Sequence, residues 1–167
     1  VCLTGMVPTR AMSPHVPLTP AEIARDVETC AALGASMVHL HARDDDEAPD
    51  WRPEVYQAIL DAVRRAVPDV VTCVSTSGRR VGDPERRMAV LDCDPPPDMA
   101  SLTLGSVDFL RDAALNPLPF VAALAERMRA RGVRPELEIF NEGMARTAAR
   151  LVAAGALAPP VYANLFL

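Results

Sequence analysis

The stretch SMVHLHARDDD, residues 36–46, carries two histidines two positions apart in an otherwise apolar run. The run predicts a strand, and side chains at positions i and i+2 of a strand point to the same face. His39 and His41 are therefore expected on one face. Two neutral imidazoles so placed can bind one divalent ion such as Zn²⁺. The spacing alone leaves metal binding and a pair of hydrogen-bonded histidines at the edge of a core equally open.

The rest of the chain alternates between two kinds of segment. Apolar runs rich in Val, Leu, Thr and Met predict strands at residues 1–7, 36–42, 69–75, 99–104, 137–140 and 161–167. Segments with helix-start signals predict helices at 18–34, 52–67, 83–92, 116–132 and 141–155. In the first of these helices, Thr19 and Glu22 form a capping-box pattern. Strand and helix alternating at roughly 30-residue spacing is typical of right-handed parallel β-α units.

The strand ends distinguish two folds built from such units. A dinucleotide-binding doubly wound sheet carries G-x-G-x-x-G after its first strand, whereas this chain has LTGMVPTRAMSPHVP. Polar residues instead end strand after strand, as at the catalytic end of a barrel. We therefore expect an α/β fold of the (β/α)8 TIM-barrel type. The 167 residues have room for about six of the eight units, so we expect one barrel domain over residues 1–167, truncated at its C-terminus. Its open sheet edges predict either self-association as a homo-oligomer or instability.

Composition excludes several kinds of function. The net charge is −5 without a basic stripe, and there is no long apolar run, so we expect neither nucleic acid nor membrane as a partner. Four scattered cysteines favour reduced thiols and a cytoplasmic location over a disulfide framework. All 17 basic residues are arginine, and Schiff-base chemistry requires a lysine amine. Carbon–carbon bond chemistry would then need another way to polarise a carbonyl, and a metal ion is the usual one.

Polar residues at three strand ends are further candidates for substrate binding. Arg43 follows the histidine pair, and we expect it either to pair with Asp44 or to bind a substrate carboxylate. Ser75 and Thr76 end the third predicted strand ahead of a Gly turn, which favours a cradle for a carboxylate or carbonyl oxygen. An ordinary polar turn explains them equally well. Thr103 ends the fourth predicted strand, where strand propensity alone also explains a threonine.

Two acids in PELEIF form the second candidate group. Glu136 and Glu138 alternate along one strand and are expected to point inward, where carboxylates are costly unless they are paired or bind an ion. Glu138 lies nearer the end of the strand, although the pattern does not decide which acid faces the site. A catalytic zinc site also needs a third protein ligand. His15 is the remaining histidine, and its spacing does not connect it to the pair.

Taken together, several segments resemble the beta-keto acid cleavage enzymes, typified by 3-keto-5-aminohexanoate cleavage enzyme. They are LTG…SPHVPLTPAEIA, GASMVHLHARD, VSTSG, MASLTLGSVDF, NP…F, RPELEIFNEG and GALAPPVYANLFL. The resemblance implies a (β/α)8 barrel with zinc or another divalent ion bound by His39 and His41. It implies that a β-keto acid reacts with acetyl-CoA as co-substrate, through Claisen and retro-Claisen steps with CoA transfer, to give acetoacetate and a new CoA ester.

The resemblance also implies roles for Ser75, Thr103 and Glu138, which match positions that hold the substrate in the family. The family's third metal ligand, a glutamate after the seventh strand, and its catalytic arginine and acidic residue match no position here. The identity of the β-keto acid is likewise left open. Two alternatives come from other classes. One is a metal-dependent hydrolase of the amidohydrolase type, although its H-x-H belongs to the first strand. The other is a non-catalytic truncated barrel that acts as a binding or assembly partner.

Overall fold

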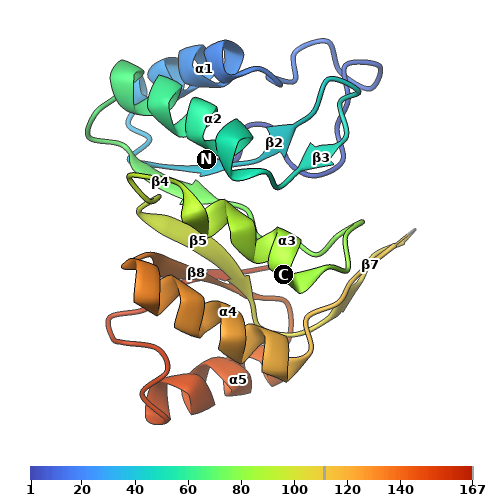
Figure 1. Ribbon diagram of the computed structural model, residues 1–167, viewed down its shortest axis with the longest axis vertical. Helices are drawn as coiled ribbons and strands as arrows, with labels where there is room; N and C mark the ends of the chain where they lie inside the picture. Colours follow the sequence, from blue (N-terminus) through green and yellow to red (C-terminus); the bar gives the residue numbers. More distant parts are fainter. Residues whose placement is uncertain (111, 167) are drawn as a thin grey trace.

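The computed structural model describes residues 1–110 and 112–166 of the chain (Figure 1). Its centre is a five-stranded parallel sheet in which neighbouring strands follow the order of the chain. The strands are β1 (Met37–Leu40), β4 (Val71–Val74), β5 (Met99–Thr103), β8 (Arg134–Ile139) and β9 (Tyr162–Leu165). Because each new strand is added on the same side of the previous one, the topology is that of a barrel wall rather than of a doubly wound sheet.

The helices lie between the strands, as the sequence predicts. They are α1 (Pro20–Ala32), α2 (Pro53–Ala66), α3 (Pro84–Met88), α4 (Leu118–Arg131) and α5 (Glu142–Ala153). The predicted capping box is confirmed, because the side chains of Thr19 and Glu22 each accept a hydrogen bond from the other's backbone N–H. Gly132 ends α4 in the left-handed conformation with φ of 70°, which glycine adopts without steric cost.

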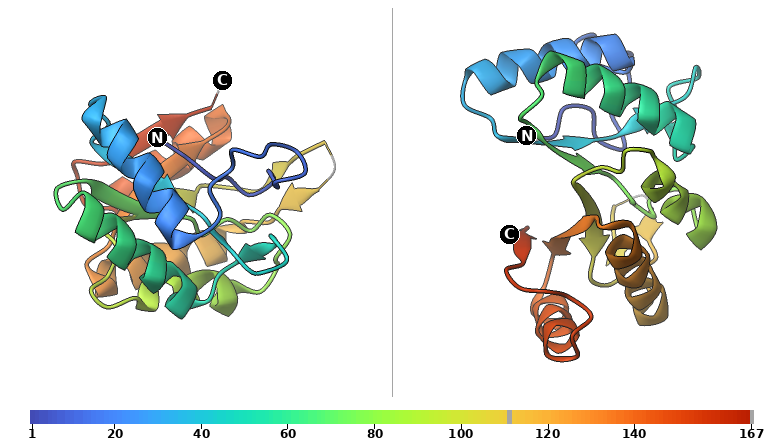
Figure 2. Two further views of the ribbon diagram at one scale, coloured as in Figure 1. Left: turned by 90° about the horizontal axis from the view of Figure 1, so that it is seen from above. Right: turned by 60° about the vertical axis from the view of Figure 1, so that its left-hand side comes forward.

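The sheet curls, and the helices follow the outside of the curve. In the right-hand view of Figure 2 they surround the sheet from the top, through the right, to the bottom, while both ends of the chain lie on the left. The architecture is therefore α/β, with a curled parallel sheet that forms part of a barrel wall. The sheet's helix-covered side holds most of the apolar core, which includes Val27, Leu60, Val63 and Leu124, all 1% exposed or less.

The predicted strand over residues 1–7 is wrong except at its start. Cys2 forms a parallel bridge with His39, and the N–H of His39 donates to the carbonyl of Val1 at 2.7 Å. Gly5 then takes a φ of +70°, which turns the backbone out of the extended conformation. The side chain of Thr4 fixes this turn by donating to the carbonyl of Pro17 at 2.8 Å.

Other differences concern short elements. The predicted strand over residues 36–42 divides into β1 and β2 (Ala42–Arg43), and β2 pairs with β3 (Pro49–Asp50). A second small hairpin joins β6 (Val107–Asp108) to β7 (Ala113–Ala114). The predicted helix at 83–92 continues from α3 into a 3₁₀ turn, η1 (Ala89–Asp92). Among the described residues, no helix is both long and apolar enough to cross a membrane.

Candidate active site

A cavity of about 430 Å³ lies on the inner side of the sheet, between the N-terminal stretch and β9. Side chains from both edges of the sheet and from several loops contribute to it. Its lining residues are Val1, Cys2, Gly5, Met6, Met37, His39, His41, Ser75, Ser77, Arg79, Phe109, Glu136, Glu138, Phe140, Tyr162, Asn164 and Phe166. Both histidines, Ser75 and the two acids of PELEIF therefore meet in one cavity, whereas Arg43, Thr76 and Thr103 are not part of its lining.

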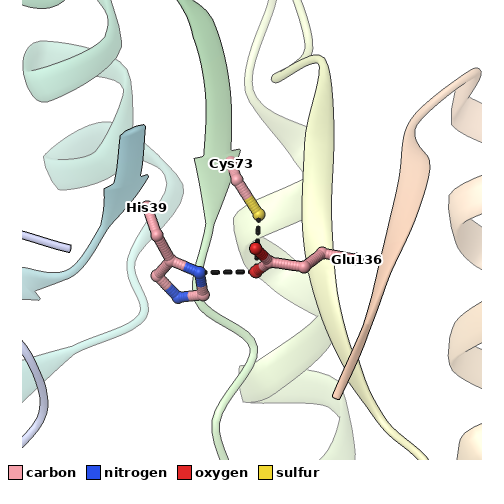
Figure 3. A group of neighbouring side chains, drawn as sticks. All are labelled: His39, Cys73 and Glu136. Atoms are coloured by element: carbon pink, nitrogen blue, oxygen red, sulfur yellow. Dashed lines mark hydrogen bonds and ion pairs between the residues drawn. The ribbon is translucent and has the colours of Figure 1, made fainter. Parts of the chain in front are cut away.

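His39 and Glu136 of this cavity form a connected group with Cys73, which lies behind the lining residues (Figure 3). They come from β1, β4 and β8, and their ligand atoms lie within 4.8 Å of one another. Nδ1 of His39 lies 2.6 Å from Oε2 of Glu136, and the Cys73 thiol donates to the same oxygen at 3.2 Å. Asn164 donates to the other carboxylate oxygen at 2.8 Å. Glu136 is therefore a buried acceptor with three partners.

The electrostatics of this group favour an ionised Glu136. Burial alone raises the pKa of its carboxyl, but the hydrogen bond and charge of His39, together with the bonds from Cys73 and Asn164, outweigh burial and hold that pKa below its ordinary value. Burial, followed by the charge of Glu136, strongly raises the pKa of the Cys73 thiol. An ionised carboxylate only accepts hydrogen bonds, so His39 donates Nδ1–H, and in the neutral form of His39 the other ring nitrogen, Nε2, is left for a ligand.

His41 lies beside His39, with 4.8 Å between the ring centroids, as expected for histidines two apart on an extended segment. Its Nδ1 is 3.6 Å from the sulfur of Cys2. Burial, and then the nearby charges of His39 and Arg43, lower the pKa of His41 well below its ordinary value. The imidazole of His41 is therefore neutral near pH 7, which is the form that binds a metal ion.

The second acid has the opposite tendency. Burial raises the pKa of Glu138, and this effect outweighs the hydrogen bond that Thr103 Oγ1 donates to Glu138 Oε2 at 2.5 Å. Two carboxyl groups on one strand thus have pKa values shifted in opposite directions. This arrangement is common where one carboxylate stays ionised and the other exchanges a proton. Thr103 does not line the cavity and reaches it only through Glu138.

The loop after β4 is held in place by hydrogen bonds that involve buried side chains. Thr76 donates through Oγ1 to the carbonyl of Ser101 at 2.7 Å, so the hydroxyl of Thr76 is used within the fold. The buried guanidinium of Arg87 donates to the carbonyl of Thr76 at 2.9 Å, and burial lowers the pKa of Arg87 to about 10. The indole N–H of Trp51 donates to the carbonyl of Ser77 at 3.2 Å. These bonds fix the backbone that follows Ser75, and the side chain of Ser75 lines the cavity.

Arg43 does not pair with Asp44, contrary to one expectation from the sequence. Its Nη groups donate to the carbonyls of Gly5 and Pro8 in the first loop and of Glu47, at 2.7–3.1 Å. Asp44 instead accepts from two backbone N–H groups of its own loop. Nε of Arg43 has no partner in the described part of the chain. The contacts thus favour a bracing role for Arg43, and binding of a substrate carboxylate by Arg43 stays a prediction.

The residues present fit a divalent ion at the histidine pair. One imidazole is neutral because of burial, and the other is oriented by a carboxylate at Nδ1, the arrangement that metal-binding histidines usually have. His15 is exposed and is not among the lining residues. Sequence reasoning missed Cys73, because aligning the two predicted strands from their first residues would place Thr72 opposite His39, whereas the structure pairs His39 with Cys73. It also missed Arg79 and the phenylalanines, for which the sequence carries no local signal.

The curled parallel sheet thus carries a histidine pair and two inward acids at its inner face. A family model described as beta-keto acid cleavage enzyme matches residues 1–167, and the chain belongs to that family.

Individual relatives agree with this assignment. The chain is 37% identical over 155 residues to 3-oxoadipate:acetyl-CoA acetyltransferase of Cupriavidus necator, covering 93% of this chain and 54% of that protein. It is 34% identical over 168 residues to 3-keto-5-aminohexanoate cleavage enzyme of Acetoanaerobium sticklandii, covering 99% and 60%. Among solved structures, apo ObcA superposes with a TM-score of 0.80 at 26% identity, over 90% of this chain and 36% of that one. The chain thus spans 54–60% of the length of the two curated relatives and 36% of the length of ObcA.

Proposed function

We propose that this chain forms the metal-binding portion of a beta-keto acid cleavage enzyme that uses acetyl-CoA as co-substrate. The reaction converts a β-keto acid and acetyl-CoA into acetoacetate and a CoA ester of the remaining acyl group. The proposal depends on one observation: the imidazoles of His39 and His41 lie side by side in one cavity, and Glu136 binds Nδ1 of His39. Family membership and the names of the relatives support it.

In this proposal His39 and His41 hold a divalent ion, with zinc the first choice because it prefers imidazole and carboxylate ligands. The ion supplies Lewis-acid polarisation of the substrate ketone. Glu136 keeps His39 in the tautomer that presents Nε2 to the cavity. The absence of lysine agrees with this choice, because the chain cannot activate a ketone through an imine.

The remaining residues bind substrate and move protons. Ser75 lines the cavity at the end of β4, where its hydroxyl is placed to hold a substrate oxygen. Glu138 is the candidate proton-transfer group, because burial raises the pKa of its carboxyl and so makes the carboxylate a stronger base towards a proton on carbon. Thr103 orients Glu138 through their hydrogen bond. Thr76 anchors the loop of residues 75–78, the serine loop, through its hydrogen bond to the carbonyl of Ser101.

The complete fold in this proposal is a (β/α)8 barrel, to whose wall the chain contributes its five-stranded parallel sheet and the helices between the strands. A homo-oligomeric assembly and a cytoplasmic location remain predictions from the sequence. The amidohydrolase alternative finds no support in the cavity, where the described lining contains no histidine besides the pair.

The test combines metal content with turnover. The chain is purified without chelators, its metal is measured by mass spectrometry, and acetoacetate formation from acetyl-CoA and a panel of β-keto acids is followed. The double variant His39→Ala/His41→Ala is expected to lose both metal and turnover. His15→Ala is the matched control, because His15 is an exposed histidine outside the cavity and should change neither. A folded, metal-loaded chain without turnover would instead support the non-catalytic alternative.

A further inference from the structure

Part of the cavity wall is built from aromatic side chains that three separate segments supply. Phe109 follows β6, Phe140 follows β8 and Phe166 follows β9. The rings of Phe140 and Phe166 stack with centroids 4.3 Å apart, and Phe109 meets Phe140 edge to face at 6.5 Å. Such contacts fix the rings relative to one another. The cavity therefore has an apolar aromatic wall as well as the polar wall with the histidines.

Arg79 lies on this aromatic wall and is held there by four contacts, two of its side chain and two of its backbone. Its guanidinium carbon lies 4.1 Å from the ring centroid of Phe109, which is cation–π distance. Its Nε donates to Oδ1 of Asp112 at 2.7 Å. Its backbone forms a bridge with Ala114 of β7, and its N–H donates to Ser77 Oγ at 3.2 Å. A long side chain so restrained has already lost much of its conformational freedom before any ligand binds.

The same guanidinium retains donors and positive charge for a ligand. Nε of Arg79 is occupied, while its Nη groups make no hydrogen bond within the described part of the chain. Asp112 also faces Arg80 at 3.6 Å, so one carboxylate compensates two guanidinium groups. Among the described lining residues Arg79 is the single arginine, and the sequence contains no lysine. Apart from the histidines, Arg79 is therefore the side chain of the described lining that offers positive charge to an anion.

We propose that Arg79 binds a carboxylate at the distal end of the substrate, so that the preferred substrates are β-keto dicarboxylic acids. The inference rests on the proposed function and extends it to the substrate class. A guanidinium presents planar paired donors that match a carboxylate. The stacked phenylalanines pack against the methylene groups between the two ends of such a substrate. Arg79 thus determines specificity at one end, and the histidine pair binds the other.

Calorimetric titration of the chain with added Zn²⁺ and without acetyl-CoA tests this proposal, because no turnover then takes place. The probes are two six-carbon β-keto acids. The far end of 3-oxoadipate is a carboxylate, and the far end of 3-oxohexanoate is a methyl group. The wild-type chain should bind the dicarboxylate roughly 10- to 100-fold more tightly, the range expected for hydrogen bonds to a charged group. Arg79→Gln should abolish the preference, and Arg79→Lys should keep it in reduced form. Arg80→Gln is the matched control, since Arg80 is half exposed and does not line the cavity.

Each outcome decides a separate point. Equal affinity of the wild type for both acids, or an unchanged preference in a folded Arg79→Gln chain, would overturn the role of Arg79 and leave the proposed function standing. Failure of both acids to bind would overturn the proposed function, and the inference with it. Acetyl-CoA is titrated separately. A preference that survives in Arg79→Gln while acetyl-CoA affinity falls would mean that Arg79 binds a phosphate of the co-substrate, which also overturns the proposal.

Discussion

Replacing Glu136 with glutamine should weaken metal binding at the histidine pair without unfolding the chain. Glutamine has the size of glutamate and can still accept a hydrogen bond from His39. It loses the charge, however, and its amide group then faces either the donor of Asn164 or the donors of His39 and Cys73. At a site only 1% exposed, one of these donors is left without an acceptor.

The magnitude follows from two effects. Loss of the group that orients a metal-binding histidine typically costs 10- to 100-fold in metal affinity, which corresponds to roughly 1.4–2.7 kcal/mol. One unsatisfied buried donor costs about 1–3 kcal/mol of folding stability. The two effects are separable, because the second is present in the metal-free chain and the first is not.

Zinc affinity is measured by competition with a fluorescent chelator, and stability by urea unfolding of the metal-free chain. Glu142→Gln makes the same chemical change at the surface, where Glu142 pairs with Arg146 across one turn of α5, and it should alter neither quantity by much. If Glu136→Gln is destabilised as expected but binds zinc as tightly as the wild type, the argument that Glu136 orients a metal-binding His39 is refuted.

Three further predictions concern the fold around the site. Gly78→Ala should destabilise the chain by about 1–3 kcal/mol, because an added methyl group would meet the buried guanidinium of Arg87 at 2.6 Å, whereas Gly82→Ala, which has no atom within 4 Å, should not; urea unfolding compares the two variants. Leu102→Ala should cost roughly 2–5 kcal/mol because the side chain is fully buried, and a loss below 1 kcal/mol in the same assay would contradict the packing. Glu22→Gln should be less stable than the wild type at neutral pH. Hydrogen bonds from the backbone before α1, and then from an arginine, lower the pKa of Glu22 to about 2, so this stabilisation is present above its ordinary value of 4.5 and is lost as the pH falls from 4.5 towards 2. The stability difference between the variant and the wild type should therefore shrink across that interval, and a difference independent of pH would contradict this assignment.

Local signals in the sequence predicted the helices well. The capping box at the start of α1 and the glycine that ends α4 act within a few residues, so they are readable without tertiary information. The same is true of the histidine pair, because two residues on one extended segment share a face regardless of the fold. The first strand was mispredicted because Gly5 turns the backbone after a single bridge, and an apolar run does not reveal that turn.

The contacts that give the site its chemistry are not local. His39 and Glu136 are 97 residues apart, and Cys73 joins them from a third strand. The opposite pKa shifts of Glu136 and Glu138 depend on these cross-strand partners, so two acids that look equivalent in the sequence differ in the fold. The position of Arg79 likewise depends on a hairpin that the sequence pattern did not predict.

The hydrogen bond between Trp51 and the serine loop makes tryptophan fluorescence a probe of that loop. The chain has one tryptophan, and its N–H donates to the carbonyl of Ser77, a residue of the cavity wall. The indole is buried, with the guanidinium of Arg86 at 5.3 Å from the ring. Tryptophan emission from this chain therefore originates beside the loop that carries Ser75 and Arg79. A shift in its wavelength or intensity would report movement of that loop in real time, without any label.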